Sequence, residues 1–547
     1  MKILIVGGVA AGASAAARIR RLDESSEIVL FEKTAHISFA NCGLPYYIGG
    51  VINDRSKILV QTPESMKGRF NIDVRTNSEV VEILPEEHKV KVRSASGDYE
   101  EHYDRLILAP GARPFVPPVP GANDSRIYFV RNVHDADILK EMTLHHSNAV
   151  VIGGGFVGIE TAENLINRGL SVTMVEAAPH VMVPFDSDMS PLLEEALEKN
   201  GVNLILNNGI THFEDKDGKL NIHLADGSSL QTEFCVLSIG VRPDTAWLLN
   251  SGLSMDNRGN ILVDDHMRTN LPDVFAAGDA VSVTNRVSGK ASAVQLAGPA
   301  NREGRIAADN ILGRNSHYPG NLATSVLKVF NLSAACTGLN ERMLNAENIP
   351  YHTVFAHPKS HANYYPDACD MHIKLLYADS GRILGAQAIG EQGVDKFIDV
   401  IATTMHFRGT IDDLTQLELA YAPPYLSAKS PANYCGYIAQ NEREGLIENV
   451  SSTRLDLLEP NDVVLDTRLP EEHNAEPIPG SLFIPLNELR ERLPELESYR
   501  DKTIVVLCRA GLRGYIACRI LTQHGFRAVN IKGGYLSYKA AHYKAGK

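Results

Sequence analysis

A pattern of apolar strand, glycine turn and helix occurs twice in this chain and constrains its fold more than any other feature. In the first copy, KILIVGGVAAGASAAARIRRL, the turn carries Gly7, Gly8 and Gly12, and the following strand EIVLFEK contains Glu32 near its end. Val9 occupies the place of the second glycine of GxGxxG. Such a turn holds a pyrophosphate on the helix N-terminus, and the acidic residue bonds a ribose hydroxyl. Taken alone, this copy is also compatible with a generic strand-to-helix turn.

The second copy has the complete spacing. The segment NAVVIGGGFVGIETAENLINRGLSVTMVE carries Gly153, Gly155 and Gly158, and its second strand ends at Glu176. A carboxylate there accepts a bond from the 2′-hydroxyl of NADH and repels the 2′-phosphate of NADPH. The following AAP supplies no arginine for that phosphate. The pattern therefore predicts a nicotinamide dinucleotide site that prefers NADH to NADPH.

A third segment, TNLPDVFAAGDAV, predicts a strand that delivers Asp279, and the helix GPANREGRIAADNIL follows it. Together with YDRLILAPGARP at 103–114 and VLSIGVRP at 236–243, these segments resemble the pyridine nucleotide-disulfide oxidoreductase family over about residues 1–445. The resemblance implies FAD in the first unit, NADH in the second, and an interface domain that makes a homodimer. Asp279 is expected to bond the ribityl chain of the flavin.

Composition limits the classes of partner. The 547 residues are too many for one hydrophobic core. The formal net charge of −13 disfavours nucleic acid and anionic membranes, so we expect a small-molecule substrate. No apolar run reaches the roughly 18 residues that span a bilayer. The seven scattered cysteines indicate reduced thiols and a cytoplasmic location, and the lack of CxxC and HExxH motifs gives no support for a metal site.

A single cysteine follows the first dinucleotide unit. Cys42, in SFANCGLPYY, is the only cysteine before Cys235. Disulfide reductases of the lipoamide or glutathione type carry CxxxxC, but Tyr47 occupies the second position here. One sulfur can form a mixed disulfide with a small thiol or cycle through a sulfenic acid. The stretch resembles the single-cysteine branch of the family, namely coenzyme A-disulfide reductases, NADH oxidases and NADH peroxidases.

The choice within that branch depends on substrate residues. Arg18 and Arg21 share one helical face and Arg69 adds a cation; guanidinium groups suit the phosphates of coenzyme A, although surface arginines are commonly only solvated. The predicted coenzyme A site consists of these three arginines together with Ser14, Ser38 and Asn41. His36, near Cys42, does not decide for the oxidase or peroxidase branch.

Two tyrosine-rich segments, HANYYPDA and ELAYAPPYLSAKS, lie in the expected interface domain. Structural tyrosines are common at interfaces. The resemblance to coenzyme A-disulfide reductases implies that Tyr364 and Tyr421 lie beside Cys42 of the other subunit, with Tyr365 and Tyr425 as alternatives. Their hydroxyls could donate a proton to the leaving thiolate.

A separate α/β pattern begins after residue 460. The strand TIVVL delivers Cys508 into the loop CRAGLRGY, where backbone N–H groups, Arg509 and Arg513 would lower the thiol pKa and hold a persulfide. Cys518, in the following helix, is expected to pack. The CxxGxR pattern, which includes Gly511, resembles a rhodanese domain together with DTR at 466–468 and IPGSLFIPL at 478–486. Cdc25-type phosphatases share a similar cradle, but their loop is usually one residue longer.

The predicted fold is α/β, with two nested Rossmann-like dinucleotide-binding domains, an α+β dimerisation domain and a C-terminal α/β rhodanese domain. The expected boundaries are 1–112 and 243–321 for the FAD-binding domain, 113–242 for the NAD(P)H-binding domain, 322–445 for the dimerisation domain, 446–460 for a linker and 461–547 for the rhodanese domain.

The predicted function is NADH-dependent reduction of coenzyme A persulfide, polysulfide or disulfide through Cys42, with Cys508 handling sulfane sulfur. One alternative is an NADH oxidase or peroxidase that cycles Cys42 through a sulfenic acid. Another is a sulfur carrier in which the flavin part serves only as a redox sensor.

Overall fold

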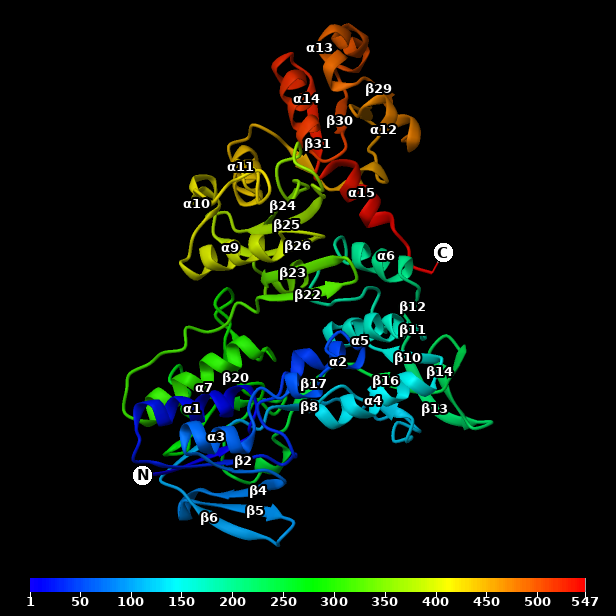
Figure 1. Cartoon of the computed structure of the whole chain (residues 1–547). Coiled ribbons are helices and arrows are strands. Elements are labelled where there is room, and N and C mark those ends of the chain that lie inside the picture. Colours follow the sequence, from blue (N-terminus) through cyan, green and yellow to red (C-terminus); the bar gives the residue numbers. More distant parts are fainter. Residues whose placement is uncertain (547) are drawn as a thin grey trace. The chain divides into compact units, whose positions relative to one another are not determined.

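The computed structural model describes residues 1–546 and divides into two compact units (Figure 1). Unit 1 comprises residues 1–179 and 201–323, and unit 2 comprises residues 180–200 and those from 324 onward. Within the described residues, no helix combines the length and the apolar composition that crossing a bilayer requires.

The first sheet of unit 1 is parallel and has the order β19-β7-β1-β2-β3. Its strands are β1 (Lys2–Val6), β2 (Glu27–Phe31), β3 (Asp73–Arg75), β7 (Arg105–Leu108) and β19 (Val274–Ala276). They read as continuous apolar runs because both faces of a parallel sheet are buried. Helix α1 (Ala10–Leu22) packs against α7 (Ala297–Ile311). Because β19 pairs with β7, the chain after residue 243 returns to this sheet and brings Asp279 to it.

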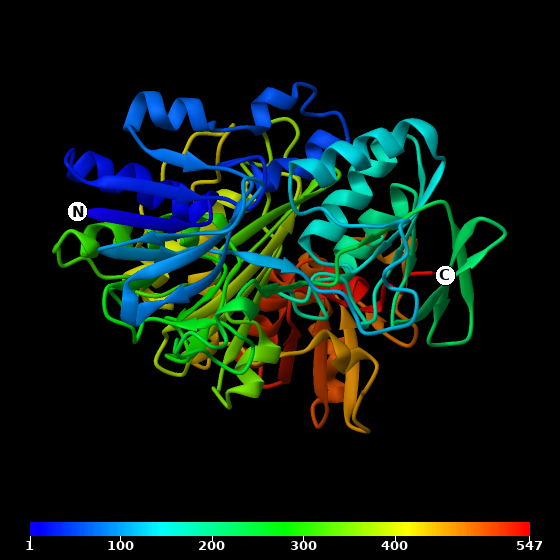
Figure 2. The same ribbon diagram turned by 90° about the horizontal axis from the view of Figure 1, so that it is seen from below.

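The second sheet of unit 1 repeats this arrangement, with the order β12-β11-β10-β16-β9. Its strands are β9 (Ile127–Tyr128), β10 (Asn148–Ile152), β11 (Ser171–Val175), β12 (Val202–Ile205) and β16 (Cys235–Leu237), and α5 (Phe156–Asn167) follows β10. Strands β8 (Ala112–Pro114) and β17 (Val241–Pro243) pair where the chain enters and leaves this domain. Strands β13 (Ile210–Lys216) and β14 (Lys219–Leu224) form a hairpin that extends outward (Figure 1, Figure 2).

Unit 2 contains an antiparallel sheet with the order β22-β23-β26-β25-β24. Its strands are β22 (Ser325–Val329), β23 (Leu332–Gly338), β24 (His352–Ala356), β25 (Met371–Tyr377) and β26 (Ile383–Gly390). Helix α9 (Val394–His406) packs on β23 and β26. Helices α10 (Ile411–Gln416) and α11 (Pro431–Arg443) complete this domain.

Residues 180–200 form part of unit 2, although the sequence assigned them to the NAD(P)H-binding domain. The fully buried Lys374 on β25 forms ion pairs with Asp186 and Asp188 of this segment and with Glu341. A buried ammonium group must be paired to offset its loss of hydration, and these carboxylates raise the pKa of Lys374 despite burial. The ion pairs therefore tie this segment, which includes α6 (Pro191–Lys199), to the antiparallel sheet.

The C-terminal sheet of unit 2 is parallel and has the order β27-β31-β30-β28-β29. Its strands are β27 (Asn449–Val450), β28 (Asp462–Asp466), β29 (Leu482–Phe483), β30 (Thr503–Leu507) and β31 (Arg527–Ile531). Helices α12 (Pro470–Ala475), α14 (Leu512–Gln523) and α15 (Gly534–His542) accompany it. The segment 446–460, expected as a linker, contributes β27 to this sheet, and Ile447 is buried in its core.

Candidate active site

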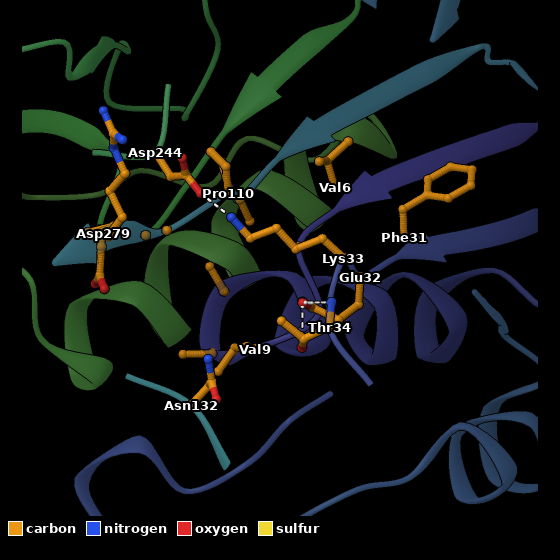
Figure 3. A pocket seen from close by; sticks show the side chains of 18 of the residues that line it. Val6, Val9, Phe31, Glu32, Lys33, Thr34, Pro110, Asn132, Asp244 and Asp279 are labelled. Atoms are coloured by element: carbon orange, nitrogen blue, oxygen red, sulfur yellow. Dashed lines mark hydrogen bonds and ion pairs between the residues drawn. The ribbon is translucent and has the colours of Figure 1, made fainter. Parts of the chain in front are cut away.

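The first glycine turn opens onto a pocket in unit 1 (Figure 3). The pocket is lined by the turn itself, by residues 32–34 after β2, by residues 109–114 after β7 and by Asp279. Figure 3 shows Glu32 and Asp279 lying apart in this pocket. Burial raises the pKa of Asp279, and Arg131 partly offsets this effect. A pocket with a carboxylate directly after β2 and a second acidic group apart from it fits a dinucleotide.

Both glycine turns have the same geometry. A Cβ on Gly12 would lie 1.9 Å from the Gly7 oxygen, and a Cβ on Gly158 would lie 1.9 Å from the Gly153 oxygen, so neither position tolerates a side chain. Gly155 occupies the place of Val9 in the first turn, and a Cβ there would meet no atom within 4 Å. The departure from GxGxxG at Val9 is therefore compatible with the turn.

The acidic residues that follow the second strand of each unit, Glu32 and Glu176, make equivalent contacts in the two units. The Glu32 carboxylate accepts a hydrogen bond from the Gly8 N–H at 3.0 Å and another from the Thr34 N–H at 2.9 Å. The Glu176 carboxylate accepts from the Gly154 N–H at 2.6 Å and from the Ala178 N–H at 2.8 Å. Each carboxylate thus lies at its glycine turn, where a ribose hydroxyl would replace one of these contacts.

Cys42 lies next to the first pocket. It is the central residue of η1 (Asn41–Gly43), ahead of α2 (Leu44–Ile48), and Asn41 lines the pocket together with Asp279. The thiol is accessible, yet partial desolvation raises its pKa, and Glu160 and Asp279 raise it further. Tyr47, at the position of a second cysteine, donates its hydroxyl proton to Asp137 at 3.0 Å. The site therefore offers one accessible sulfur in negatively charged surroundings.

Glu160 was missed by the sequence analysis. It lies on α5, two residues after Gly158, and accepts a hydrogen bond from the Tyr46 hydroxyl at 3.1 Å. Burial raises the pKa of Glu160 to about 7. Only its place two residues after the second glycine turn could have drawn attention to it, because nothing in the linear pattern connects it with Cys42.

The residues predicted to bind coenzyme A are only partly assembled. Ser14, Arg18 and Arg21 lie on one face of α1, where the Ser14 hydroxyl contacts Asn301 and Arg18 pairs with Asp309 at 2.7 Å. Arg21 and Arg69 are exposed, and Arg69 lies on α3 (Pro63–Phe70). The Ser38 N–H donates to the Gly8 carbonyl at 2.7 Å, which places that loop at the first glycine turn, and Asn41 accepts from Arg131 at 2.9 Å. Arg18 would therefore have to share or leave Asp309 in order to bind a phosphate.

The predicted tyrosine pair forms in unit 2. The hydroxyls of Tyr364 and Tyr421 are 2.8 Å apart, although the residues are 57 positions apart in sequence. This hydrogen bond raises the pKa of Tyr364. Both side chains are exposed, as are those of Tyr365 and Tyr425. The structure thus brings together the two tyrosines that the sequence analysis preferred, on the surface of the dimerisation domain.

The predicted persulfide loop lies between β30 and α14. Cys508 is almost fully buried, and the Gly511 N–H donates to its sulfur at 3.1 Å. The pKa of Cys508 is raised, contrary to the lowering that the sequence predicted, because burial outweighs the N–H groups of Gly514, Ala510 and Gly511 and the charge of Arg513. Gly511 adopts φ +99°, which favours glycine. Cys518 is buried in the hydrophobic core, consistent with packing.

Among the residues that the structure describes, two groups of side chains could ligate a metal ion. They are His212, Glu214 and His223 on the β13–β14 hairpin, and Asp265, His266 and His317, and in each group the ligand atoms lie within 4.8 Å of one another. Linear motifs do not show these groups because their members come from separate segments of the chain.

Comparisons with known proteins agree with this architecture. Residues 1–304 match the pyridine nucleotide-disulphide oxidoreductase family, residues 324–431 match the dimerisation domain of that family, and residues 453–541 match the rhodanese-like domain. Coenzyme A disulfide reductase from Staphylococcus haemolyticus is 35% identical over 454 residues, which cover 80% of this chain and 99% of that protein.

Solved structures extend the similarity to the C-terminal domain. Reduced CoADR-RHD from Bacillus anthracis has a TM-score of 0.96 and 45% identity, covering 99% of this chain and 98% of that one. A NAD-dependent persulfide reductase from A. fulgidus has a TM-score of 0.93 and 36% identity, covering 98% and 100%. The water-forming NADH oxidase from Lactobacillus brevis has a TM-score of 0.79 and 27% identity, and covers 81% of this chain. This chain belongs to the pyridine nucleotide-disulphide oxidoreductase family and carries a rhodanese-like domain after the dimerisation domain.

Proposed function

We propose that this enzyme uses NADH to reduce the persulfide or disulfide of coenzyme A through Cys42, and that Cys508 carries sulfane sulfur. The observation that carries the proposal is the accessible Cys42 beside the first dinucleotide pocket, with Tyr47 in place of a second cysteine. The relatives named as coenzyme A disulfide reductase and as persulfide reductase support this substrate class. The oxidase relative covers 81% of this chain, whereas the persulfide reductase covers 98% of it.

Membership in the family implies FAD and a nicotinamide dinucleotide as cofactors. We assign FAD to the pocket that contains Gly7, Gly8, Gly12, Glu32 and Asp279, and the nicotinamide dinucleotide to the turn that contains Gly153, Gly155, Gly158 and Glu176. When bound, FAD supplies the two-electron transfer from the nicotinamide to a disulfide of Cys42.

Cys42 performs the sulfur chemistry. Its thiolate attacks the inner sulfur of coenzyme A persulfide, the sulfur–sulfur bond breaks, and hydrosulfide leaves with the bonding electron pair. The resulting mixed disulfide of Cys42 and coenzyme A then takes two electrons and one proton, which returns the Cys42 thiolate and releases the coenzyme A thiol. Over the whole cycle NADH and the persulfide yield NAD⁺, coenzyme A and hydrosulfide.

The tyrosine pair is assigned to proton donation in a homodimer. Tyr364 and Tyr421 share a hydrogen bond on an exposed surface of the dimerisation domain, so a partner subunit could present them to Cys42. A hydroxyl that already accepts a hydrogen bond from its neighbour can donate its own proton to the departing thiolate.

The preference for NADH rests on Glu176. An engineered variant of the L. brevis oxidase, in which an aspartate is replaced by alanine and two arginines are introduced, is described as an NADPH oxidase bound to NADPH. In this chain, replacing Glu176 with serine removes the charge that would repel the 2′-phosphate. We expect Glu176→Ser to narrow the ratio of kcat/KM for NADH over NADPH by about tenfold. An unchanged ratio would contradict the role of Glu176.

The proposed function is tested by anaerobic NADH consumption with coenzyme A persulfide, coenzyme A disulfide and hydrogen peroxide in parallel. Cys42→Ser should abolish persulfide turnover and hydrosulfide release, whereas Cys508→Ser should retain disulfide reduction. Dominant turnover of peroxide, with none of the persulfide, would overturn the proposal in favour of a peroxidase. Sulfur transfer by Cys508 without NADH consumption on any of the three substrates would instead favour a sulfur carrier.

A further inference from the structure

The two arginines of the persulfide loop each face a carboxylate. Arg513 Nη2 lies 2.6 Å and 2.9 Å from the two oxygens of Glu472 on α12. Arg509 Nη2 lies 2.6 Å from Asp370 Oδ2. The side chains of Arg509 and Arg513 are 37% and 25% exposed, so solvent screens these pairs only in part. Glu472 Oε1 also lies 3.9 Å from Arg509 Nε, so both guanidinium groups are already paired with carboxylates.

Asp370 belongs to the dimerisation domain, which also contains the tyrosine pair. It lies immediately before β25, and its Oδ1 is 3.0 Å from Lys359 Nζ. Residues 359 and 370 form a β-bridge at the base of the connection between β24 and β25. This pairing holds the carboxylate in place, with its second oxygen turned to Arg509.

The same connection supports the loop at a second point. His357 Nε2 lies 2.8 Å from the Ser537 hydroxyl on α15. The N–H groups of Tyr535 and Leu536, at the start of α15, donate to the carbonyls of Cys508 and Arg509 at 2.7 Å and 3.0 Å. Burial keeps the pKa of His357 well below its usual range, so it adds no charge. The backbone of the loop is therefore supported without the two guanidinium groups.

A negative charge on the Cys508 sulfur is therefore stabilised mainly by backbone N–H groups, and the paired Arg513 contributes less. The Gly511 N–H reaches the sulfur, and the nearby Cys518 thiol is buried and uncharged. Such amides stabilise a single negative charge on a sulfur. A donor that brings two further negative charges needs unpaired cations, and Asp370 and Glu472 engage both arginines.

We propose that Asp370 and Glu472 determine the donor specificity of Cys508: they neutralise Arg509 and Arg513, so that the loop accepts sulfane sulfur from organic thiol persulfides and discriminates against dianionic donors. This inference rests on the proposed function of Cys508 as a sulfur carrier. The reacting end of coenzyme A is an uncharged thiol arm, and its phosphates lie at the other end of the molecule, so it suits a neutralised loop.

The transfer step balances for both donor classes. The Cys508 thiolate attacks the outer sulfur of an organic persulfide, the sulfur–sulfur bond breaks, and the organic thiolate leaves with the bonding pair while Cys508 keeps the persulfide proton. With thiosulfate the same attack on the outer sulfur releases sulfite and leaves an ionised persulfide on Cys508. Neither reaction requires an external oxidant or reductant.

The test uses full-length, flavin-loaded protein with Asp370→Asn, with Glu472→Gln and with both substitutions. Formation of the Cys508 persulfide is measured by mass spectrometry at increasing thiosulfate and, separately, at increasing coenzyme A persulfide. We expect each substitution to lower KM for thiosulfate by about tenfold, because it removes one of the two carboxylates that pair with Arg509 and Arg513, and to leave KM for coenzyme A persulfide within about twofold. Cys42→Ser in all proteins removes the exposed thiol, and the persulfide is assigned to Cys508 from the mass of its peptide.

A second measurement does not require sulfur transfer. The pH dependence of Cys508 alkylation should move to lower pH in Asp370→Asn and in Glu472→Gln, because the uncompensated Arg509 or Arg513 stabilises the thiolate. Asp379→Asn removes an exposed carboxylate that pairs with His352 in the same domain and should change neither result.

Unchanged thiosulfate KM and unchanged alkylation profile in the folded variants would overturn the specificity assignment while leaving the proposed function in place. Failure of the unaltered chain to load Cys508 from either donor would overturn the proposed function, and this inference with it. If the alkylation profile were still shifted in the variants, Asp370 and Glu472 would control the charge around Cys508 as proposed. The sulfur-carrier role of Cys508 would then be the assignment that is wrong.

Discussion

Cys42 and Cys508 are the two thiols to which chemistry is assigned, and the chain surrounds them in opposite ways. Cys42 is accessible on a short 3₁₀ helix, where partial desolvation, Glu160 and Asp279 raise its pKa. Cys508 is almost fully buried, but a row of backbone N–H groups is directed at its sulfur and opposes the effect of burial. The pKa of each thiol is raised, but the groups around Cys508 oppose the effect of burial, whereas the carboxylates near Cys42 add to it.

This difference matches the two kinds of sulfur chemistry. A carrier must hold a persulfide until an acceptor arrives, so its stabilising groups belong to the fold and are permanent. A redox thiol passes between a disulfide and a thiolate once in each cycle, so stabilisation can come from cofactor and substrate at the moment they are bound. The comparison therefore predicts that damage to the backbone around Cys508 abolishes transfer, whereas changes around Cys42 alter rates and pH dependence.

The largest effect is expected from Gly534→Ala. Gly534 has φ +62°, and a Cβ there would lie 2.4 Å from the Cys508 oxygen and 2.9 Å from the Ala510 nitrogen. The substitution must displace the persulfide loop, and we expect loading of Cys508 to fall by about a hundredfold, equivalent to roughly 3 kcal/mol. Coenzyme A disulfide reduction by the same protein should persist, because that reaction uses Cys42.

Gly525→Ala is the matched control, because it also places a Cβ on a residue with positive φ but away from the persulfide loop. Gly525 has φ +83°, but a Cβ there would approach only the flexible end of Arg500. Equal loss of sulfur loading in both variants would show that the domain as a whole, rather than the loop backbone, had failed. Loss of disulfide reduction in Gly534→Ala would contradict the inference that Cys42 acts independently of Cys508.

An intermediate effect is expected from Tyr364→Phe. The substitution removes one of two hydroxyls that lie 2.8 Å apart and leaves the ring in place. If Tyr364 and Tyr421 protonate the leaving thiolate, kcat for disulfide and persulfide reduction should fall by about tenfold to a hundredfold. Loading of Cys508 should be unaffected. Tyr425→Phe, on an equally exposed tyrosine, is the control, and a larger loss there would transfer the role to Tyr425.

The two sites also differ in how far the sequence predicts them. The parts that act on the Cys508 sulfur are contiguous, so CxxGxR was sufficient to predict the loop. Asp370, the partner of Arg509, lies 139 residues earlier and becomes visible only when the two domains are folded. At Cys42 the glycine turn and the thiol were predictable, but Glu160 reaches Tyr46 across 114 residues. Short sequence motifs predict which backbone groups surround a thiol. They do not predict the charged side chains near it, because tertiary packing brings those together.

The same reasoning explains two departures from the sequence analysis. The imperfect glycine pattern weakened the prediction of the first turn, yet the open space at Gly155 shows that the position of Val9 accepts a side chain. The assignment of residues 180–200 to the NAD(P)H-binding domain at 113–242 followed chain order, whereas the buried Lys374 attaches this segment to unit 2. The spacing of residues along the chain predicts neither the space around Gly155 nor the ion pairs of Lys374.

The smallest predicted effect concerns the charge beside Cys42. Because the pKa of Glu160 is raised to about 7, its carboxyl is neutral below pH 7 and charged above it, and the charged form raises the pKa of Cys42. In Glu160→Gln this charge is absent at every pH. In Glu160→Gln, alkylation of Cys42 should therefore be about twofold to fivefold faster than in the unaltered protein above pH 7 and equal to it well below pH 7.

Glu141→Gln, on an exposed helix face, controls for a general change of charge. A constant rate ratio across the whole pH range would mean that Glu160 does not ionise near pH 7, and the negatively charged surroundings of Cys42 would then have to be assigned to Asp279.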